Sequence, residues 1–519
     1  MTDTELSRRA LLARLARGGA GAGAAALLGG SLSSCGQADA PGAGGRDLSA
    51  ASLPQLASAT SALRAGDAYA FRSRPDLKAP VITLDVRTAE ASPGLIVTDA
   101  HAGPTYQGPL ILDGEGNLVW FLPLSPGKDV SKRAFNVRVQ SYRGRPVLAW
   151  FVGAVVLAHG QGHYELWDSS YSKVAEVHGQ DGYQADLHEF LLTKQGTALF
   201  TCYGQANANL SKFGGKTVGS YFYGVVQEVD LGTGKLLFEW RSDSHVALEE
   251  SYLPLKNPDY PWDYFHVNSI DIDPTDGHLI VSGRNTSTFY KLHRTSGEVL
   301  WKCGGKSSDF EIAQDSNYFF QHDVRRRPDG SVTLFDNEGG PPWRGSQSRA
   351  LVLAFDEKAR TVELIRQYVH SPKVRSGALG SVQDLADGHR FVGWGEASYF
   401  TEYDGAGRVV FDGGLAPGTE SYRAFKQRWV GRPKVPPAIF VARGGSSATV
   451  YASHNGCTGI AKWVIVGGAT AARLAPVGWA KHMGFETAVT VPRPPAYLAA
   501  EAVDGAGQVL GRSAPASLR

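Results

Sequence analysis

The sequence predicts an all-β fold, for three reasons. The 519-residue chain is rich in glycine (62 residues) and in aromatic side chains (10%), a composition typical of strands joined by tight turns. Short apolar runs recur with turn residues between them, and no long amphipathic helical pattern follows the leader. The chain is also too long for one ordinary domain, so we expect two folded domains.

The N-terminus predicts export. Twin arginines in Ser7–Leu12 precede a weakly apolar, Gly/Ala-rich run at 18–30, which is typical of a Tat signal. Leu32–Cys35 is similar to a lipobox, so we expect a lipoprotein signal peptide at 1–35 and acylation of Cys35. The lipid would hold the protein at the outer face of the bacterial cytoplasmic membrane. An ordinary cleavage site with an incidental cysteine is the alternative.

Residues 36–70 are rich in Ala, Gly and Ser and lack periodicity, so we expect a flexible tether. The remaining cysteines are odd in number, which allows at most one internal pair, and we favour three buried thiols. They are Cys202, Cys303 and Cys457. A net charge of +2, with 20% charged residues, gives no electrostatic footprint for nucleic acid.

One hairpin pattern recurs six times, at intervals of roughly 50 to 60 residues, which suits the blades of a propeller. Each copy is an apolar run, usually an Asp, a turn and a second run. The copies are Pro109–Asp113 with Leu118–Phe121, Tyr164–Asp168 with 174–175, Val226–Asp230 with Leu236–Phe238, Tyr290–His293 with Val299–Trp301, Val352–Asp356 with Val362–Leu364, and Phe400–Asp404 with Val409–Phe411. A second hairpin precedes most copies, so we expect a six-bladed β-propeller at 71–433.

The pattern changes after Arg432–Pro437. Short alternating segments follow, such as Ala448–Ser453 and Tyr497–Ala502. This length and alternation are typical of an immunoglobulin- or fibronectin-type β-sandwich, which we expect at 434–519.

His188, His266 and His322 occupy equivalent places in three successive repeats. A single histidine is more often structural, but three at the inner strand of neighbouring blades would converge on one pocket. Asn268 should point to the same side as His266, because their strand alternates. Arg284 ends the next strand and can return beside His266, although an arginine taken alone is more often a surface residue.

This set contains imidazoles, an amide and a guanidinium but no carboxylate. Such groups suit transfer of an anionic group, in which a neutral imidazole attacks and the other groups bind oxygens. Sulfuryl transfer is one such reaction. The rival interpretation is a catalytic zinc or iron site made by the three histidines. The sequence contains no phosphate-binding loop and no nucleophile elbow between a strand and a helix.

The chain resembles the arylsulfotransferase family from about Phe71 to Pro433. The motifs that carry the resemblance are Ala185–Phe190, Tyr264–Ser269, Trp301–Lys306, Phe320–Asp323 and Phe391–Gly395. Known members are six-bladed propellers of bacterial envelopes. The resemblance implies a PAPS-independent arylsulfotransferase that needs no cofactor. It would move a sulfuryl group from a phenolic sulfate ester to a phenol by a ping-pong mechanism.

The resemblance also assigns roles. His322 would form the sulfohistidine; His266, Asn268 and Arg284 would hold the sulfate oxygens; His188 would act as acid and then base. Better-understood members carry an N-terminal sandwich and are usually dimers, whereas this chain places its sandwich at the C-terminus. A non-catalytic envelope binding protein is a further alternative.

Overall fold

The computed structural model describes residues 67–124, 132–340 and 345–518. Its strands all belong to one compact unit, Ser61–Arg519. The predicted signal peptide at 1–35, its Cys35 and the tether up to residue 66 lie outside the described residues and stay predictions. In the part described, no helix is long and apolar enough to cross a membrane.

The predicted all-β fold is confirmed, because the described helices are single 3-10 turns between strands. These turns are η2 (Ser211–Phe213), η3 (Ser242–Ser244), η4 (Leu248–Glu250), η5 (Gln314–Ser316) and η6 (Gly395–Ala397). All six predicted hairpins form, each as an antiparallel pair.

Four sheets before residue 430 contain four or five strands each. The first has the order β27 (Phe425–Gln427), β2 (Leu95–Ala100), β3 (Gly108–Leu112), β4 (Leu118–Phe121). Another has β14 (Val267–Ile272), β15 (Leu279–Gly283), β16 (Thr288–Leu292), β17 (Val299–Gly304). A third has β18 (Glu311–Ile312), β22 (Thr361–Tyr368), β21 (Arg349–Asp356), β20 (Val332–Asp336), β19 (His322–Arg326). The last has β1 (Ile82–Arg87), β26 (Val409–Leu415), β25 (Tyr399–Tyr403), β24 (Arg390–Gly393), β23 (Ser381–Asp384).

A nine-stranded sheet contains two more four-stranded runs. One run is β5 (Arg133–Tyr142), β6 (Arg145–Val156), β7 (His159–Trp167) and β8 (Lys173–Val177). The other is β9 (Ala185–Leu192), β10 (Thr197–Ala208), β11 (Gly219–Asp230) and β12 (Leu236–Arg241), with β13 (Trp262–Asp263) beside β11. Gly162 on β7 pairs with Ala185 on β9, which joins the two runs into one sheet.

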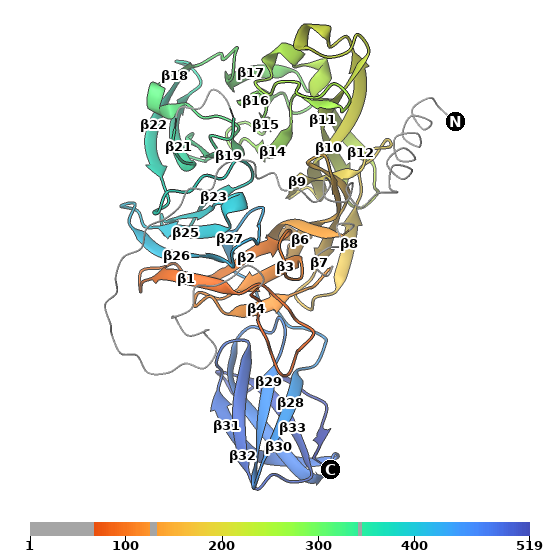
Figure 1. Ribbon diagram of the computed structural model, residues 1–519, viewed down its shortest axis with the longest axis vertical. Helices are drawn as coiled ribbons and strands as arrows, with labels where there is room; N and C mark the ends of the chain where they lie inside the picture. The colour runs from red at the N-terminus through yellow and green to blue at the C-terminus, as the bar shows by residue number, and fades with distance from the viewer. Residues whose placement is uncertain (1–66, 125–131, 341–344, 519) are drawn as a thin grey trace. The chain divides into compact units, whose positions relative to one another are not determined.

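Buried side chains connect each sheet to the next and the last sheet to the first. The cluster around Trp120 and Trp150 joins the first sheet to the nine-stranded one, and the cluster around Phe391 joins the β23–β26 sheet back to Leu110 of the first. The chain closes the series as well, because β27 follows β26 yet pairs with β2 (Figure 1). The four sheets and the two four-stranded runs add up to six units, which agrees with the predicted number of blades; that number itself stays a prediction.

The C-terminal strands form two sheets that share one core. One sheet contains β28 (Ala438–Gly444), β29 (Ser447–Ser453) and β32 (Glu486–Pro492). The other contains β31 (Arg473–Lys481), β30 (Ile460–Thr470), β33 (Tyr497–Asp504), β34 (Val509–Arg512) and β35 (Ala516–Ser517). Val450, Trp463, Val489 and Leu498 pack together between the two sheets. This arrangement is compatible with the predicted sandwich, whose type stays a prediction.

The strands that carry the candidate histidines are irregular. The pairing register shifts between Phe200 and Cys202 opposite β9, between Val267 and Ser269 in β14, and between His322 and Arg325 in β19. His266 also has a left-handed backbone, with φ of 57°. Bulges and left-handed residues turn side chains out of the regular alternation, so these strand starts can aim polar groups inward.

Candidate functional site

His188 and His266 face each other across two neighbouring inner strands. Their Nε2 atoms lie 3.1 Å apart, and both side chains are almost fully buried. The His188 Nδ1 lies 2.7 Å from an oxygen of Asp186, and the His266 Nδ1 lies 2.5 Å from an oxygen of Asp263. The expectation of a site without carboxylates is therefore wrong, because each imidazole of this pair has its own aspartate.

His322 is held in one tautomer by a fixed amide. The Asn337 side chain donates from Nδ2 to the carbonyls of Ser376 and Leu379, so its oxygen must face His322 Nδ1, 2.7 Å away. Nδ1 therefore carries the proton and Nε2 keeps a lone pair, which accepts the backbone N–H of Leu379 at 3.2 Å.

His322 is also kept neutral. Its side chain is fully buried. Burial, and then the positive charge of Arg284, holds the pKa of His322 well below its ordinary range. A neutral imidazole with an unprotonated, oriented nitrogen is the form that can act as a nucleophile.

Arg284 lies beside His266, as the predicted hairpin required. The backbone N–H of Arg284 donates to the His266 carbonyl at 2.9 Å. The guanidinium donates to Asn285 Oδ1 and to the Gly377 carbonyl, at 2.8 and 3.0 Å, and lies over the Phe320 ring. Within the described residues it has no carboxylate within salt-bridge distance, and burial lowers its pKa. A cation in this state can bind an anion.

Asn268 is fully buried but does not follow simple alternation from His266. The register shift in β14 falls at this residue, and its Nδ2 donates to the Gln321 carbonyl at 2.7 Å, next to His322. Asn268 therefore connects the strand after His266 to the start of β19. Its Oδ1 has no hydrogen-bond partner in the part of the chain that the structure describes.

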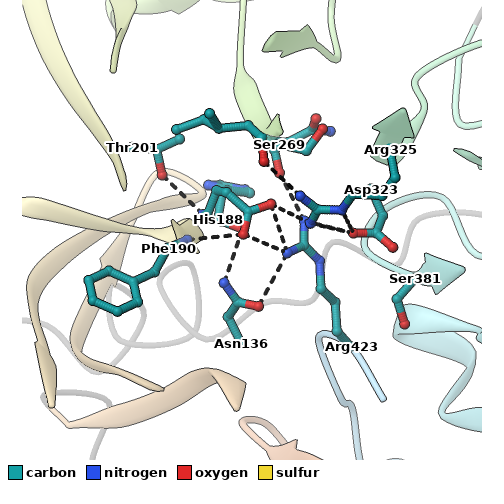
Figure 2. Close-up of polar contacts among 12 residues, drawn as sticks. Asn136, His188, Phe190, Thr201, Ser269, Asp323, Arg325, Ser381 and Arg423 are labelled. Atoms are coloured by element: carbon teal, nitrogen blue, oxygen red, sulfur yellow. Dashed lines mark hydrogen bonds and ion pairs between the residues drawn. The ribbon is translucent and has the colours of Figure 1, made fainter. Parts of the chain in front are cut away.

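A buried charged cluster lies next to the pair and supports it. Its members are Arg138, Glu189, Asp323, Arg325 and Arg423. Figure 2 shows Arg423 and Arg325 converging beside Asp323, close to His188. Glu189 Oε2 lies 3.2 Å from Arg423 and 2.5 Å from Arg325. Since these residues come from different sheets, the cluster ties the inner strands together.

His159, on β7, is a fourth buried imidazole, and it was not among the predicted site residues. Its Nε2 lies 3.2 Å from the Asp263 oxygen that also contacts His266. One ligand atom each from His159, Asp263 and His266 falls within 4.8 Å of the others, a spacing that could hold a metal ion. Neither of the two such groups among the described residues joins His188 with His322, as the predicted three-histidine metal site would require.

The three remaining cysteines are free and buried, as expected. Burial raises the pKa of the thiols of Cys202 and Cys303, so both are poor nucleophiles. The chemistry of the site rests on its imidazoles and its guanidinium.

Fold and geometry together define a class: an all-β protein with a buried, cationic, histidine-based site suited to anionic groups. The chain belongs to the arylsulfotransferase (ASST) family, whose model matches residues 138–415, more than half of its length. The family supports a sulfotransferase-type function and small-molecule substrates. No curated protein matches the chain.

Several solved structures are similar to part of the chain. A protein of unknown function from Bacteroides caccae is 11% identical, with a TM-score of 0.40, over 64% of this chain and 98% of its own. The calcium-binding protein regucalcin from Agrobacterium tumefaciens is 14% identical, with a TM-score of 0.32, over 63% and 83%. A periplasmic gluconolactonase from Pseudomonas aeruginosa is 14% identical, with a TM-score of 0.32, over 82% and 98%.

Proposed function

We propose that the protein is a PAPS-independent arylsulfotransferase that passes a sulfuryl group from a phenolic sulfate ester to a phenol through a sulfohistidine on His322. The observation that carries this proposal is the state of His322: neutral, buried and fixed by Asn337 with a lone pair on Nε2. The family match supports the same reaction class. The fold we propose for it is a six-bladed propeller followed by a sandwich.

In the first half-reaction His322 Nε2 attacks the sulfur, an S–N bond forms and the S–O bond to the aryl group breaks. The leaving aryl oxide takes a proton from His188. In the second half-reaction the acceptor phenol gives a proton to His188 as its oxygen attacks sulfur, and the S–N bond breaks. Arg284, Asn268 and His266 hold the sulfuryl oxygens, whose negative charge suits a guanidinium.

Substrate entry requires a change in the segment 376–379. In the structure the Leu379 N–H donates to the lone pair of His322 Nε2, and the Arg284 guanidinium donates to the Gly377 carbonyl. A sulfuryl group would need both positions, so the donor must displace this segment.

Envelope placement belongs to the proposal too. The twin-arginine leader and the lipobox-like Leu32–Cys35 support export by Tat and a lipid anchor on Cys35 at the outer face of the cytoplasmic membrane. Substrates would then be aryl sulfates and phenols outside the cytoplasm.

The test is intact-mass spectrometry of the purified protein mixed with 4-nitrophenyl sulfate. We expect the wild type to gain the mass of one SO₃ and to release nitrophenol, and His322→Ala to do neither. A chelator should leave the rate unchanged; loss of activity that zinc or iron restores would favour a metal enzyme. If wild type forms no adduct and turns over none of several donors, while His322→Ala still binds ligand, the binding-protein alternative is favoured.

A further inference from the structure

The His188–His266 pair has a proton count that its geometry dictates. Asp186 and Asp263 each occupy an Nδ1 atom. Burial acts to raise the pKa of both aspartates, but the charge and hydrogen bonds of the neighbouring imidazoles outweigh it and hold both pKa values below the ordinary range. Both carboxylates are therefore ionised and only accept, so both Nδ1 atoms carry protons.

The two Nε2 atoms that remain lie 3.1 Å apart in a buried site. Two neutral imidazoles with Nδ1–H would point lone pairs at each other there, which leaves buried acceptors unpaired. One proton between the two Nε2 atoms removes the conflict. The pair then holds three protons on four nitrogens, and its single positive charge is flanked by two carboxylates.

We propose that His188 and His266 act as one proton-sharing pair, the general acid of the first half-reaction and the base of the second, with Asp263 and His159 as positioning residues. This rests on the proposed function, and it replaces the sulfuryl-binding role of His266, because Asp263 and His188 occupy both of its ring nitrogens. In the first step the shared proton leaves Nε2 for the aryl oxygen. In the second step the acceptor phenol returns a proton to the same position, so the pair is unchanged after one turnover.

Seven titratable or charged residues face the pair. They are Asp186, His159, Tyr203, Asp263, Arg284, His322 and Tyr422. Burial lowers the pKa of His266 to about 4 against the opposing effect of Asp263, with His188 and Arg284 lowering it further. His266 by itself therefore stays neutral near pH 7, so the shared proton depends on the 3.1 Å approach of the two Nε2 atoms between the two carboxylates.

His159 is connected to the pair by one polar contact, which it makes with Asp263. Its ring lies 4.0 Å from the Tyr203 ring and 4.5 Å from the Phe222 ring, measured between centroids, and is almost fully buried. Its Nε2 approaches only Asp263 among the carboxylates of the described residues. We assign it to holding the Asp263 oxygen on His266 Nδ1, because an unbraced carboxylate could turn away.

The first test compares donors whose phenols leave well or poorly. 4-Nitrophenolate needs little help from an acid, whereas phenolate needs much. Asp263→Asn and His159→Phe should lose roughly 10²-fold in rate with phenyl sulfate, within the range for general acid catalysis, and about threefold or less with 4-nitrophenyl sulfate. His159→Gln, which keeps a donor, should recover part of the loss. His163→Phe on the same strand is the control and should match wild type.

The pH dependence gives a second readout. The acid form of the pair is lost as pH rises, so the phenyl sulfate rate falls through the pair's apparent pKa. Removing the negative charge of Asp263 should lower that pKa and move the alkaline limb toward lower pH. Proton NMR of the free enzyme, without any substrate, should show a far-downfield signal from the shared proton that is lost as pH rises. In Asp263→Asn this loss should occur at a lower pH than in wild type.

If Asp263→Asn and His159→Phe slow the reaction equally with both donors and leave the alkaline limb of the pH profile unchanged, the proton-sharing pair is wrong. The sulfohistidine on His322 would still stand. A stoichiometric metal retained by wild type and lost in His159→Phe would overturn it in favour of a metal centre. If wild type forms no sulfuryl adduct with any donor, the proposed function fails, whereas the NMR signal still tests the pair.

Discussion

Asn337 decides which nitrogen of His322 can react. Its amide hydrogens are used by two backbone carbonyls, so its oxygen alone is left for His322 Nδ1. The nucleophile is therefore defined by a residue that need not touch substrate. Arg284 contributes in a second way, because its charge disfavours a protonated His322.

Asn337→Ala should slow adduct formation by about 10-fold or more, because His322 loses its fixed tautomer, and should cost about 1–3 kcal/mol of stability for the unsatisfied Nδ1. Single-turnover nitrophenol release and urea unfolding measure the two effects. The exposed Asn207→Ala is the matched control and should change neither. Wild-type adduct formation in Asn337→Ala would show that the tautomer is set by another group.

At the scale of elements, the β6–β7 hairpin supports the strand that carries His188. Gly160 near the start of β7 donates its backbone N–H to Asp186 Oδ1 at 2.6 Å, and Asp186 holds His188. A Cβ atom at Gly160 would lie 2.5 Å from the Leu187 backbone nitrogen. The glycine is thus required by close approach of two backbones.

Gly160→Ala should push β9 away, cost about 1–3 kcal/mol by overpacking and reduce turnover by displacing His188. Thermal unfolding and steady-state rates test this. Gly405→Ala places its Cβ in open space and should leave both quantities unchanged. Wild-type stability in Gly160→Ala would mean that the hairpin can shift without cost.

At the scale of the whole molecule, the buried charged cluster joins residues from several sheets. Three arginines surround Glu189, which is fully buried. Burial opposes ionisation of Glu189, but the charges of Arg325, Arg423 and Arg138 outweigh it and hold its pKa far below the usual range. Removing the Glu189 charge would leave three buried arginines with Asp323 as the remaining carboxylate of the cluster.

Glu189→Gln should destabilise the protein by about 3–5 kcal/mol at neutral pH. Because the folded-state pKa is depressed, the contribution of Glu189 is present above its unfolded pKa of about 4.3 and is lost as pH falls below that value. Urea unfolding at pH 7 and pH 4 measures this. From pH 7 to pH 4 the free energy of unfolding should fall more for wild type than for Glu189→Gln. Equal falls would show that Glu189 does not contribute to the pH dependence of stability.

Hairpin register is local, and local features could be predicted. The six hairpins and the return of Arg284 beside His266 follow from short-range alternation and turn residues. The same argument, applied one repeat later, leads to Asn337 directly after β20, a residue that was not among the predicted site residues. Asp186 and Asp263 were also missed, although they precede His188 and His266 by only two and three residues.

The sequence by itself determined the all-β fold, the repeats and the three candidate histidines, because side-chain period and turn chemistry are properties of neighbouring residues. Only the tertiary structure decided which polar groups meet. Bulges and a left-handed His266 break the period, and β7 brings His159 to Asp263 from about a hundred residues away. Protonation followed from those contacts, since the pKa of a buried group depends on what surrounds it.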